Sequence, residues 1–460
     1  MSVYAPGLLL AENPPGLVTP LLIRGATIVG MADASDDLEQ GDILIRDGRI
    51  ANMEASIAPD GAFVIEAAGM IAIPGFQDTH RHSWEGQLRR IMPSGDLETY
   101  RCTTHRGFAE HYRPEDIYAG TILTALHGLS SGITTILDYS HNSQSIDHCN
   151  AAIDALADSG IRAVYACSAP SILGHAKTSC IWPGVIADLA QSRFTDPEGR
   201  LSIRVAGTPS TLTQEFFDLA DQLQIGVSVD AVSGDSSSGW ILSAERNGWL
   251  GPNRTLIHCA GLSDSAWAAI ARTHTTVSLC PHADMQYMIG EPPLHQALAA
   301  GIRPSISVDD DVGLSSDMWT QMRLLSASHR RRAMLGPLEL RKQAATLTAF
   351  DLLDFATAQG AKANGLDHRC GRLMVGMDAD VVLIAGHDIN TMPLNNVYGT
   401  VVQAADSSSV DTVIVAGVIR KYRGQLTCVD IDVLRSLVRD SRDRLSSRLG
   451  RKIGILDRLA

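Results

Sequence analysis

The sequence predicts an α/β fold: a (β/α)8 barrel of the TIM type with a small flanking β-sandwich domain built from both chain ends. Between residues 74 and 372, short apolar runs of strand length alternate with longer helical stretches, which is typical of repeated βα units. Eight such runs imply a closed barrel. These candidate strands end near His80, Asp138, Cys167, Gly207, Asp230, His258, Cys280 and Asp309.

The connections between these strands have helical character. Apolar residues recur at helical spacing in Ile153, Leu156 and Ala157, and again in the stretch 216–223, in each case before the next strand. Parallel strands need crossover connections of this kind. The alternation therefore favours a parallel barrel.

The flanking β-domain is expected from two distant blocks of aliphatic residues. The early block comprises 21–29 and 41–50, with Asp47-Gly48 as a hairpin signal, and the late block comprises 379–384, 397–403 and 412–420. We predict four segments: an N-terminal part of the β-domain at 1–73, the catalytic barrel at 74–372, a C-terminal part of the β-domain at 373–426 and a helical tail at 427–460. Leucines and Val438 amid Arg and Asp make this tail amphipathic, suited to docking on the barrel.

Composition excludes several classes of function. The formal net charge of -13 argues against nucleic-acid binding, which needs a basic face, and favours a small-molecule substrate. No apolar run reaches about 18 residues, so we expect no membrane association. The 8 cysteines show no paired metal-ligand spacing, and together with the absence of a leader pattern they predict reduced thiols in a cytoplasmic protein. Whether the chain forms a homo-oligomer is left open by the composition.

The candidate chemistry begins at His80 and His82. Side chains two residues apart on a strand share a face, so both imidazoles can aim at one point beyond the strand end. That geometry suits a divalent metal ion. The pair follows an apolar strand and a Pro-Gly turn, in the stretch 71–82, which reads Ile-Ala-Ile-Pro-Gly-Phe-Gln-Asp-Thr-His-Arg-His.

With these residues the sequence resembles the amidohydrolase superfamily. The likeness extends along nearly the whole chain, and within the superfamily the sequence is similar to the branch of triazine hydrolases and cytosine- or guanine-type deaminases, which generally use one metal ion. The further segments that carry it are 132–138 on the second strand, 256–259 on the sixth, 307–309 on the eighth, and 41–50 and 376–383 in the flanking domain.

This resemblance implies roles for individual residues. His80 and His82 are expected as metal ligands, His258 as a ligand or oxyanion-stabilising group, and Asp309 as a ligand that also accepts the proton of the attacking water. The implied cofactor is one divalent transition metal, zinc first, with iron or manganese as alternatives. Read without the resemblance, His258 could be a hydrogen-bonded histidine under a loop and Asp309 could cap a helix.

Strand five departs from the family pattern. The family places a histidine ligand there and, in deaminases, a glutamate three residues later that passes protons to the leaving amine. Here Asp230 stands in place of the histidine and Ser233 in place of the glutamate. Asp230 is therefore an alternative oxygen ligand for the metal.

Polar residues after other strands are expected to bind the substrate, because the loops that follow barrel strands carry recognition. They are Trp84, Arg89, His141 and His282, and for His141 a loop histidine bonded to backbone is an equal alternative. The sequence thus predicts a metal-dependent hydrolase that attacks a C-N or related bond of a small cyclic or heteroaromatic compound with metal-activated water. The alternatives are a metal-assisted lyase, dehydratase or decarboxylase on the same fold, and a non-catalytic relative.

Overall fold

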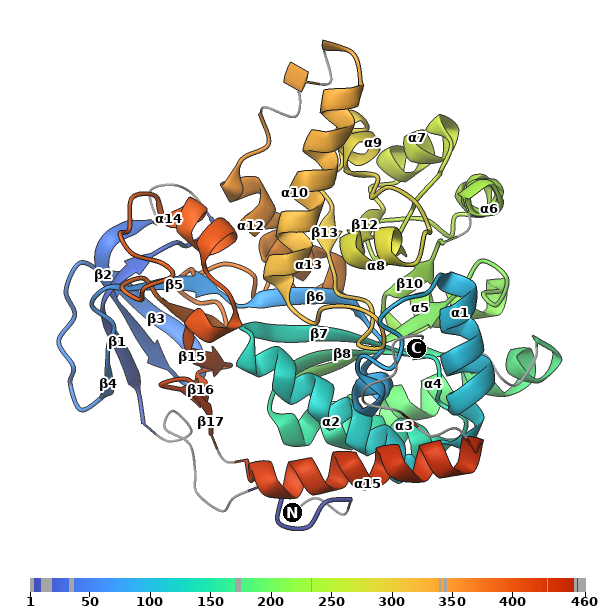
Figure 1. Ribbon diagram of the computed structural model, residues 1–460, viewed down its shortest axis with the longest axis horizontal. Helices are drawn as coiled ribbons and strands as arrows, with labels where there is room; N and C mark the ends of the chain where they lie inside the picture. Colours follow the sequence, from blue (N-terminus) through green and yellow to red (C-terminus); the bar gives the residue numbers. More distant parts are fainter. Residues whose placement is uncertain are drawn as a thin grey trace.

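The structure is a computed structural model that describes residues 4–9, 19–32, 37–169, 175–232, 234–338, 341–342, 346–427, 429–450 and 453. Its centre is a parallel eight-stranded sheet in which each strand pairs with its neighbours in sequence order (Figure 1). The strands are β6 (Phe76–Arg81), β7 (Ile133–Ser140), β8 (Arg162–Ser168), β9 (Leu201–Gly207), β10 (Val227–Asp230), β11 (Arg254–Ile257), β12 (Thr276–Leu279) and β13 (Ser305–Ile306).

The first and last strands meet and close the barrel. Asp309 donates its backbone N–H to the carbonyl of His80 at 2.9 Å, and His82 donates its own to the carbonyl of Asp309 at 2.7 Å. The side chain of Thr79 also bonds to the backbone oxygen of Ile306. All eight predicted strands are present and end within three residues of the expected positions, so the predicted (β/α)8 fold is confirmed.

Helices surround the barrel (Figure 1). Ser83–Leu88 and Ala109–His111 are 3-10 turns, and Thr104–Phe108 is a π-helical turn that continues α1. The helices are α1 (Leu97–Thr103), α2 (Pro114–Ser130), α3 (Ile146–Ser159), α4 (His175–Arg193), α5 (Gln214–Leu223), α6 (Gly234–Arg246), α7 (Asp264–Arg272), α8 (Pro281–Gln286), α9 (Leu294–Ala299), α10 (Met318–Leu335), α12 (Ala349–Ala356) and α13 (Ala358–Asn364).

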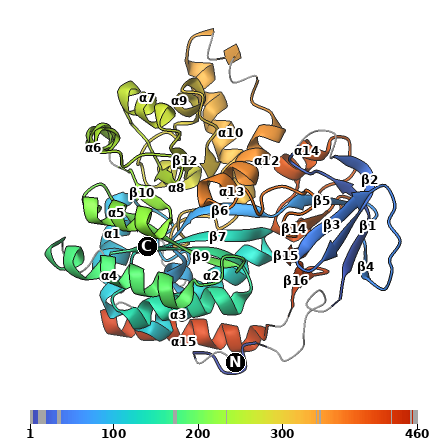
Figure 2. The same ribbon diagram turned by 180° about the vertical axis from the view of Figure 1, so that it is seen from behind.

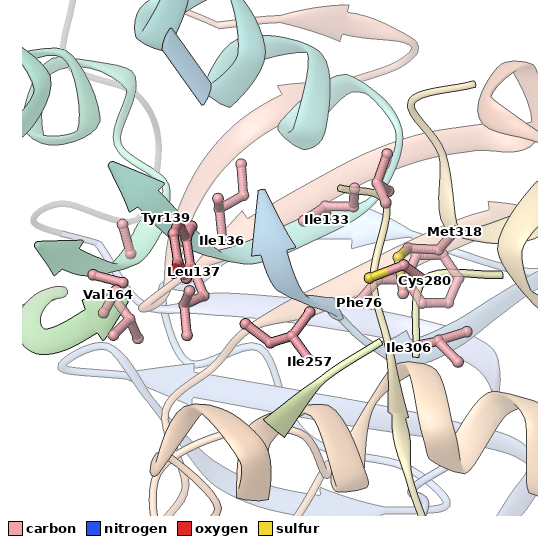
Figure 3. Packing of buried hydrophobic residues seen from close by; sticks show 14 of the residues in the cluster. Phe76, Ile133, Ile136, Leu137, Tyr139, Val164, Ile257, Cys280, Ile306 and Met318 are labelled. Carbon is pink, nitrogen blue, oxygen red and sulfur yellow. The ribbon is translucent and has the colours of Figure 1, made fainter. Parts of the chain in front are cut away.

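The largest hydrophobic core lies between these strands and the surrounding helices. Figure 3 shows Ile136 and Val164 from neighbouring strands, and Phe76, Ile306 and Met318 near the base of the first and last strands. All five side chains are fully buried. Burying aliphatic and aromatic side chains stabilises each by roughly 1.5–3 kcal/mol. The barrel is therefore a rigid support for whatever its strand ends carry.

The flanking domain is a nine-stranded mixed sheet in which both ends of the chain take part (Figure 2). β5 pairs antiparallel with β14, which joins the early strands to the late ones. Asp47 and Gly48 both have positive φ angles, 50° and 79°, as a two-residue hairpin turn requires. The strands are β1 (Leu21–Ile28), β2 (Leu38–Arg46), β3 (Arg49–Glu54), β4 (Phe63–Glu66), β5 (Met70–Pro74), β14 (Val381–Ala385), β15 (Val410–Val415), β16 (Val418–Tyr422) and β17 (Gln425–Leu426).

The expectation of a strand at 397–403 is wrong, because this stretch is helical. α14 (Val397–Gly399) begins at the N-cap Asn396, and a π-helical turn, Thr400–Ala404, follows it. The indole of Trp319 donates to the carbonyl of Val401 at 2.9 Å, so the turn is anchored on α10. These tertiary contacts override the preference of valine for strands.

The C-terminal helix α15 (Ile431–Leu449) lies along α2 at the barrel surface (Figure 1). Leu434 and Leu445 are buried, and Ser441 donates to the carboxylate of Asp116 at 2.8 Å. The amphipathic tail thus docks on the barrel as expected. None of the helices in the part of the chain that the structure describes is long and apolar enough to cross a membrane.

Candidate metal centre and substrate cavity

The end of β6 brings His80 and His82 to the carboxylate of Asp309. Nε2 of His80 lies 3.2 Å from Oδ1 of Asp309, and Nε2 of His82 lies 3.3 Å from the same oxygen. The other ring nitrogen of His82 bonds to the backbone oxygen of Tyr139 at 3.1 Å, which fixes the ring. The barrel closure between β6 and the segment after β13 therefore assembles three predicted metal ligands.

His258 joins this group from the end of β11. Its Nε2 lies 3.7 Å from Oδ2 of Asp309 and 3.8 Å from Oδ1 of Asp230, while its Nδ1 bonds to Oδ1 of Asp284 at 2.8 Å. Because a buried carboxylate holds the Nδ1 proton, Nε2 is presented to the centre with its lone pair. Asp284 is thus an orienting residue behind the centre.

The three consecutive aspartates have different surroundings. Asp309 faces the histidines, whereas Asp310 accepts the hydroxyl of Tyr287 at 2.9 Å. Asp311 forms an ion pair with Arg81 at 2.8 Å. Of this triplet, the first aspartate is the one that reaches the candidate centre.

Two residues of the centre adopt strained backbone conformations. The φ angles of His258 and Asp309 are 63° and 82°, in the left-handed region that side chains with a Cβ rarely adopt. Such conformations cost of order 1–3 kcal/mol each and concentrate at functional sites. The strain supports a functional reason for holding these two side chains where they are.

Asp230 stands at the end of β10, at the edge of the same centre. Its Oδ1 is buried without a hydrogen-bond partner. The 3.8 Å separation from Nε2 of His258 leaves room for a bridging ion or water between the two side chains. Ser233, the other departure from the family pattern, lies outside the described residues.

Charge and burial oppose one another around Asp309. Burial favours its neutral form, but the close contacts and charges of His80 and His82 hold the pKa of Asp309 well below its usual range. Burial lowers the pKa of His82, yet the contact with Asp309 outweighs it and raises that pKa to about 9. Asp309 is accordingly an ionised carboxylate, the form that binds a metal and accepts a proton.

The donor set fits a divalent transition metal. Both ring nitrogens of His80 are fully buried and lack a hydrogen bond, a cost that a coordinated ion would remove. Ligand atoms of His80, His258 and Asp309 all lie within 4.8 Å of one another. Two or three imidazoles with carboxylate oxygens match the ligands that zinc and neighbouring metals take in proteins.

A cavity of about 450 Å³ opens onto this centre, a volume typical of small-molecule sites, which span roughly 300–1,000 Å³. His82, Asp230, His258 and Asp309 form its floor. Residues that line the rest of the cavity include Leu97, Tyr100, Arg101, His105, His141, Thr208, Ser210, Ser237, Trp240 and Tyr287.

Three of the four predicted substrate-binding residues do not line the cavity. Trp84 is buried and donates its indole N–H to His141, Arg89 pairs with Asp311 at 2.9 Å, and the backbone of Ser315 donates to His282. Because the segment after β6 turns back onto α2 instead of over the barrel mouth, it places Trp84 and Arg89 behind the centre. Only His141 reaches the cavity.

The model of the amidohydrolase family matches residues 71–420. The chain belongs to the amidohydrolase family. This confirms the predicted family and, with it, the prediction of an amidohydrolase-type hydrolase. The match begins in β5 and runs through the whole barrel to β16, so it includes every residue of the candidate centre.

Curated relatives of this amidohydrolase carry a deaminase name. A 5-methylthioadenosine/S-adenosylhomocysteine deaminase of Desulforamulus reducens is 26% identical over 447 residues, covering 93% of this chain and 99% of the relative. One of the same name from Symbiobacterium thermophilum is 27% identical, covering 86% and 92% of the two chains.

Solved structures share the fold. An adenosine deaminase from Xanthomonas campestris with bound zinc superposes with a TM-score of 0.80 at 20% identity, covering 93% of this chain and 98% of the other. An atrazine chlorohydrolase from Arthrobacter aurescens, complexed with zinc, superposes with a TM-score of 0.80 at 20% identity and covers 92% and 100% of the chains.

Sequence reasoning missed the wall of the cavity in this amidohydrolase. Tyr100, Arg101 and His105 come from a helical segment between β6 and α2, and Tyr287 comes from the end of α8. None of them directly follows a strand or stands in a ligand-like spacing. The spacing of His105 from Arg101 and Tyr100, four and five residues, was the only signal, and it is equally typical of an ordinary buried helix face.

Proposed function

We propose that this amidohydrolase uses a divalent metal ion, with zinc as the first choice, to hydrolyse an exocyclic C-N bond of a small nitrogen heteroaromatic compound. The observation that supports this most is the convergence of His80, His82, His258 and Asp309 on one centre beside a cavity of small-molecule size. Zinc is preferred because of the imidazole-rich donor set and because two structural neighbours contain it.

His80, His82, His258 and Asp309 would hold the metal, with Asp230 as a further oxygen ligand. An ion bound there supplies Lewis-acid chemistry and lowers the pKa of a water molecule from 15.7 to about 7. Asp309 is ionised, so its free oxygen is able to accept the proton of the attacking water and return it later.

His258 is fixed for its role as a metal ligand. Its bond to Asp284 orients Nε2 toward the floor of the cavity, where its lone pair would hold the ion. Burial raises the pKa of Asp284, and the hydrogen bond from His258 opposes that shift. The pair is therefore a preorganised element that needs no rearrangement during the reaction.

The cavity suits an aromatic ring with polar substituents. Trp240, Tyr100 and Tyr287 offer flat apolar surfaces, and Thr208, Ser210 and Ser237 offer hydrogen-bond donors and acceptors. The named relatives are deaminases of 5-methylthioadenosine and S-adenosylhomocysteine, whose adenine carries an exocyclic amine. An aminated purine or a related ring is therefore the first substrate class to test.

Departure of the amine has no dedicated glutamate among the described cavity residues. The only carboxylates lining the described cavity are Asp230 and Asp309, both at the floor. This favours either a proton path through Asp309 alone or a second candidate function, elimination or decarboxylation assisted by the same metal ion.

The test is a substrate screen of the zinc-loaded protein in water enriched in oxygen-18. The panel contains 5-methylthioadenosine, S-adenosylhomocysteine, adenosine, cytosine, guanine and a chlorinated triazine. We expect release of ammonia with one solvent oxygen in the product. Loss of this reaction in Asp309→Asn but not in Asp264→Asn, an exposed aspartate on α7, supports the proposal. A product without solvent oxygen contradicts it and favours the second candidate.

A further inference from the structure

One wall of the cavity is formed by a single helical face. Leu97, Tyr100, Arg101 and His105 all line the cavity and recur at helical spacing along α1 and the π-helical turn that follows it. π-Helical turns inside helices are rare and frequent at functional sites. His105 lies within this turn.

His105 is held by a buried chain of hydrogen bonds. The indole N–H of Trp84 donates to Nδ1 of His141 at 3.2 Å, and Nε2 of His141 lies 2.7 Å from Nε2 of His105. Trp84 is 1% exposed and His141 is 7% exposed. The chain thus connects the segment after β6, the loop after β7 and the cavity wall.

The indole N–H of Trp84, at one end of this chain, determines the tautomers of both His141 and His105. Because Nδ1 of His141 accepts from Trp84, it carries no proton, so neutral His141 carries its proton on Nε2 and donates it to His105. Nε2 of His105 is then the acceptor, and the proton of neutral His105 lies on Nδ1. In the part of the chain that the structure describes, that Nδ1 has no hydrogen-bond partner and is not fully buried.

The same tautomers argue against a second metal ion here. Glu85, His105 and His141 place ligand atoms within 4.8 Å of one another, and Oε2 of Glu85 is buried without a partner. Coordination through Nε2 of His141 would move its proton to Nδ1, where it would face the indole N–H of Trp84. The hydrogen bonds from Trp84 to His141 and from His141 to His105 therefore fit the two histidines, and coordination of a metal ion by them does not.

Arg101 precedes His105 by four residues on the same face. Among the described residues it has neither an ion-pair nor a hydrogen-bond partner, although it lines the cavity and is only half-buried. By contrast, the buried guanidinium groups of Arg81 and Arg162 each pair with an aspartate. A guanidinium without a partner beside an N–H donor suits a planar anion.

We propose that Arg101 and His105 form a subsite for a carboxylate group of the substrate, and that Trp84 and His141 position His105 with its Nδ1–H facing that subsite. The ring of His141 lies 4.2 Å from that of His82, so the subsite adjoins the metal-binding floor. The inference deepens the proposed function, on which it rests for the identity of the cavity as the substrate site. It narrows the substrate to a heteroaromatic compound that carries an acid.

The experiment is a titration of zinc-loaded protein, labelled with nitrogen-15 in its histidines, with benzoate as the carboxylate probe. Before benzoate is added, we expect a protonated Nε2 in His141 and a protonated Nδ1 in His105, assigned with His141→Gln and His105→Asn. Benzoate should shift the Nδ1 signal of His105. The Trp84→Phe variant should change the tautomers of His141 and His105 and weaken the binding of benzoate, although it removes no group that touches benzoate.

Matched variants separate the subsite from general effects. His105→Ala and Arg101→Gln should each weaken benzoate binding by about tenfold or more, the loss expected of one charge-assisted hydrogen bond. His105→Asn, which keeps a donor, should recover part of it. His274→Asn, an exposed histidine with a φ of 56° that Asn tolerates, and Arg106→Gln, an exposed arginine of the same helical segment, should bind benzoate as the unaltered chain does.

Several outcomes overturn the proposal. A protonated Nδ1 in His141 or an absence of benzoate binding would each do so. So would benzoate binding that is unchanged in Arg101→Gln and His105→Ala, since benzoate would then bind to the zinc. A second zinc ion per chain that is lost in His105→Ala would also overturn it. None of these readouts needs turnover. If the substrate screen fails while benzoate binds as described, the proposed reaction is wrong and the subsite stands; the reverse result leaves the reaction and removes the subsite.

Discussion

The floor and the wall of the cavity are built in different ways. The floor consists of side chains at or just beyond strand ends, and their positions follow from the closure of the barrel; they are His82, Asp230, His258 and Asp309. The wall consists of a helical segment and one loop, tied together by the chain from Trp84 through His141 to His105. In this amidohydrolase we assign the metal-dependent chemistry to the rigid floor and the recognition of the substrate to the wall.

The largest effect should come from the floor. Asp309→Asn removes the proton acceptor and one ligand charge, and we expect kcat to fall by about 10²–10⁴-fold. Circular dichroism and the melting temperature should change little, because the amide fills the same volume. Steady-state kinetics with the substrate found in the screen measures the effect. A kcat of Asp309→Asn within tenfold of the unaltered enzyme would show that Asp309 is not the proton acceptor of the reaction.

A smaller effect is expected one step behind the floor. Asp284→Asn replaces the carboxylate that holds Nδ1 of His258, and loss of such an orienting partner typically weakens metal binding by about 10–100-fold. Competition with a zinc chelator measures the dissociation constant. Unchanged zinc affinity would mean that His258 does not coordinate the metal.

Asp230 tests the edge of the floor. If it supplies an oxygen ligand, Asp230→Ala should weaken zinc binding, and Asp230→His, which restores the residue type that the family carries there, should recover or exceed the original affinity. The same chelator competition measures both variants. Equal zinc affinities of the unaltered chain, Asp230→Ala and Asp230→His would show that Asp230 lines the cavity without binding the metal.

The smallest effect should come from the wall. Tyr100→Phe removes the donor to Oε1 of the buried Glu85, 2.9 Å away, and should lower stability by about 1–3 kcal/mol. Zinc content should stay the same, because no ligand is touched. Thermal unfolding and elemental analysis together measure this. Loss of zinc in Tyr100→Phe would show that wall and floor are coupled.

The contrast also explains what the sequence could predict. Strand ends are marked by apolar runs followed by a polar residue, so all eight were found, and with them His80, His258 and Asp309. His105 carries no such mark, because its position depends on a π-helical turn and on two partners distant in the chain. Similarly, the apolar pattern of 397–403 is typical of a strand, but the hydrogen bond from Trp319 to Val401 anchors this segment as a helical turn. Local pattern specifies the barrel, whereas tertiary contacts specify the wall.

The metal content of the purified chain tests the central claim most directly. Elemental analysis of the protein, as purified and after equilibrium dialysis against zinc, should give one divalent transition metal ion per chain, and His80→Ala combined with His82→Ala should abolish it while leaving the circular dichroism spectrum unchanged. A well-folded unaltered chain that holds no metal and takes up none from zinc would contradict the account.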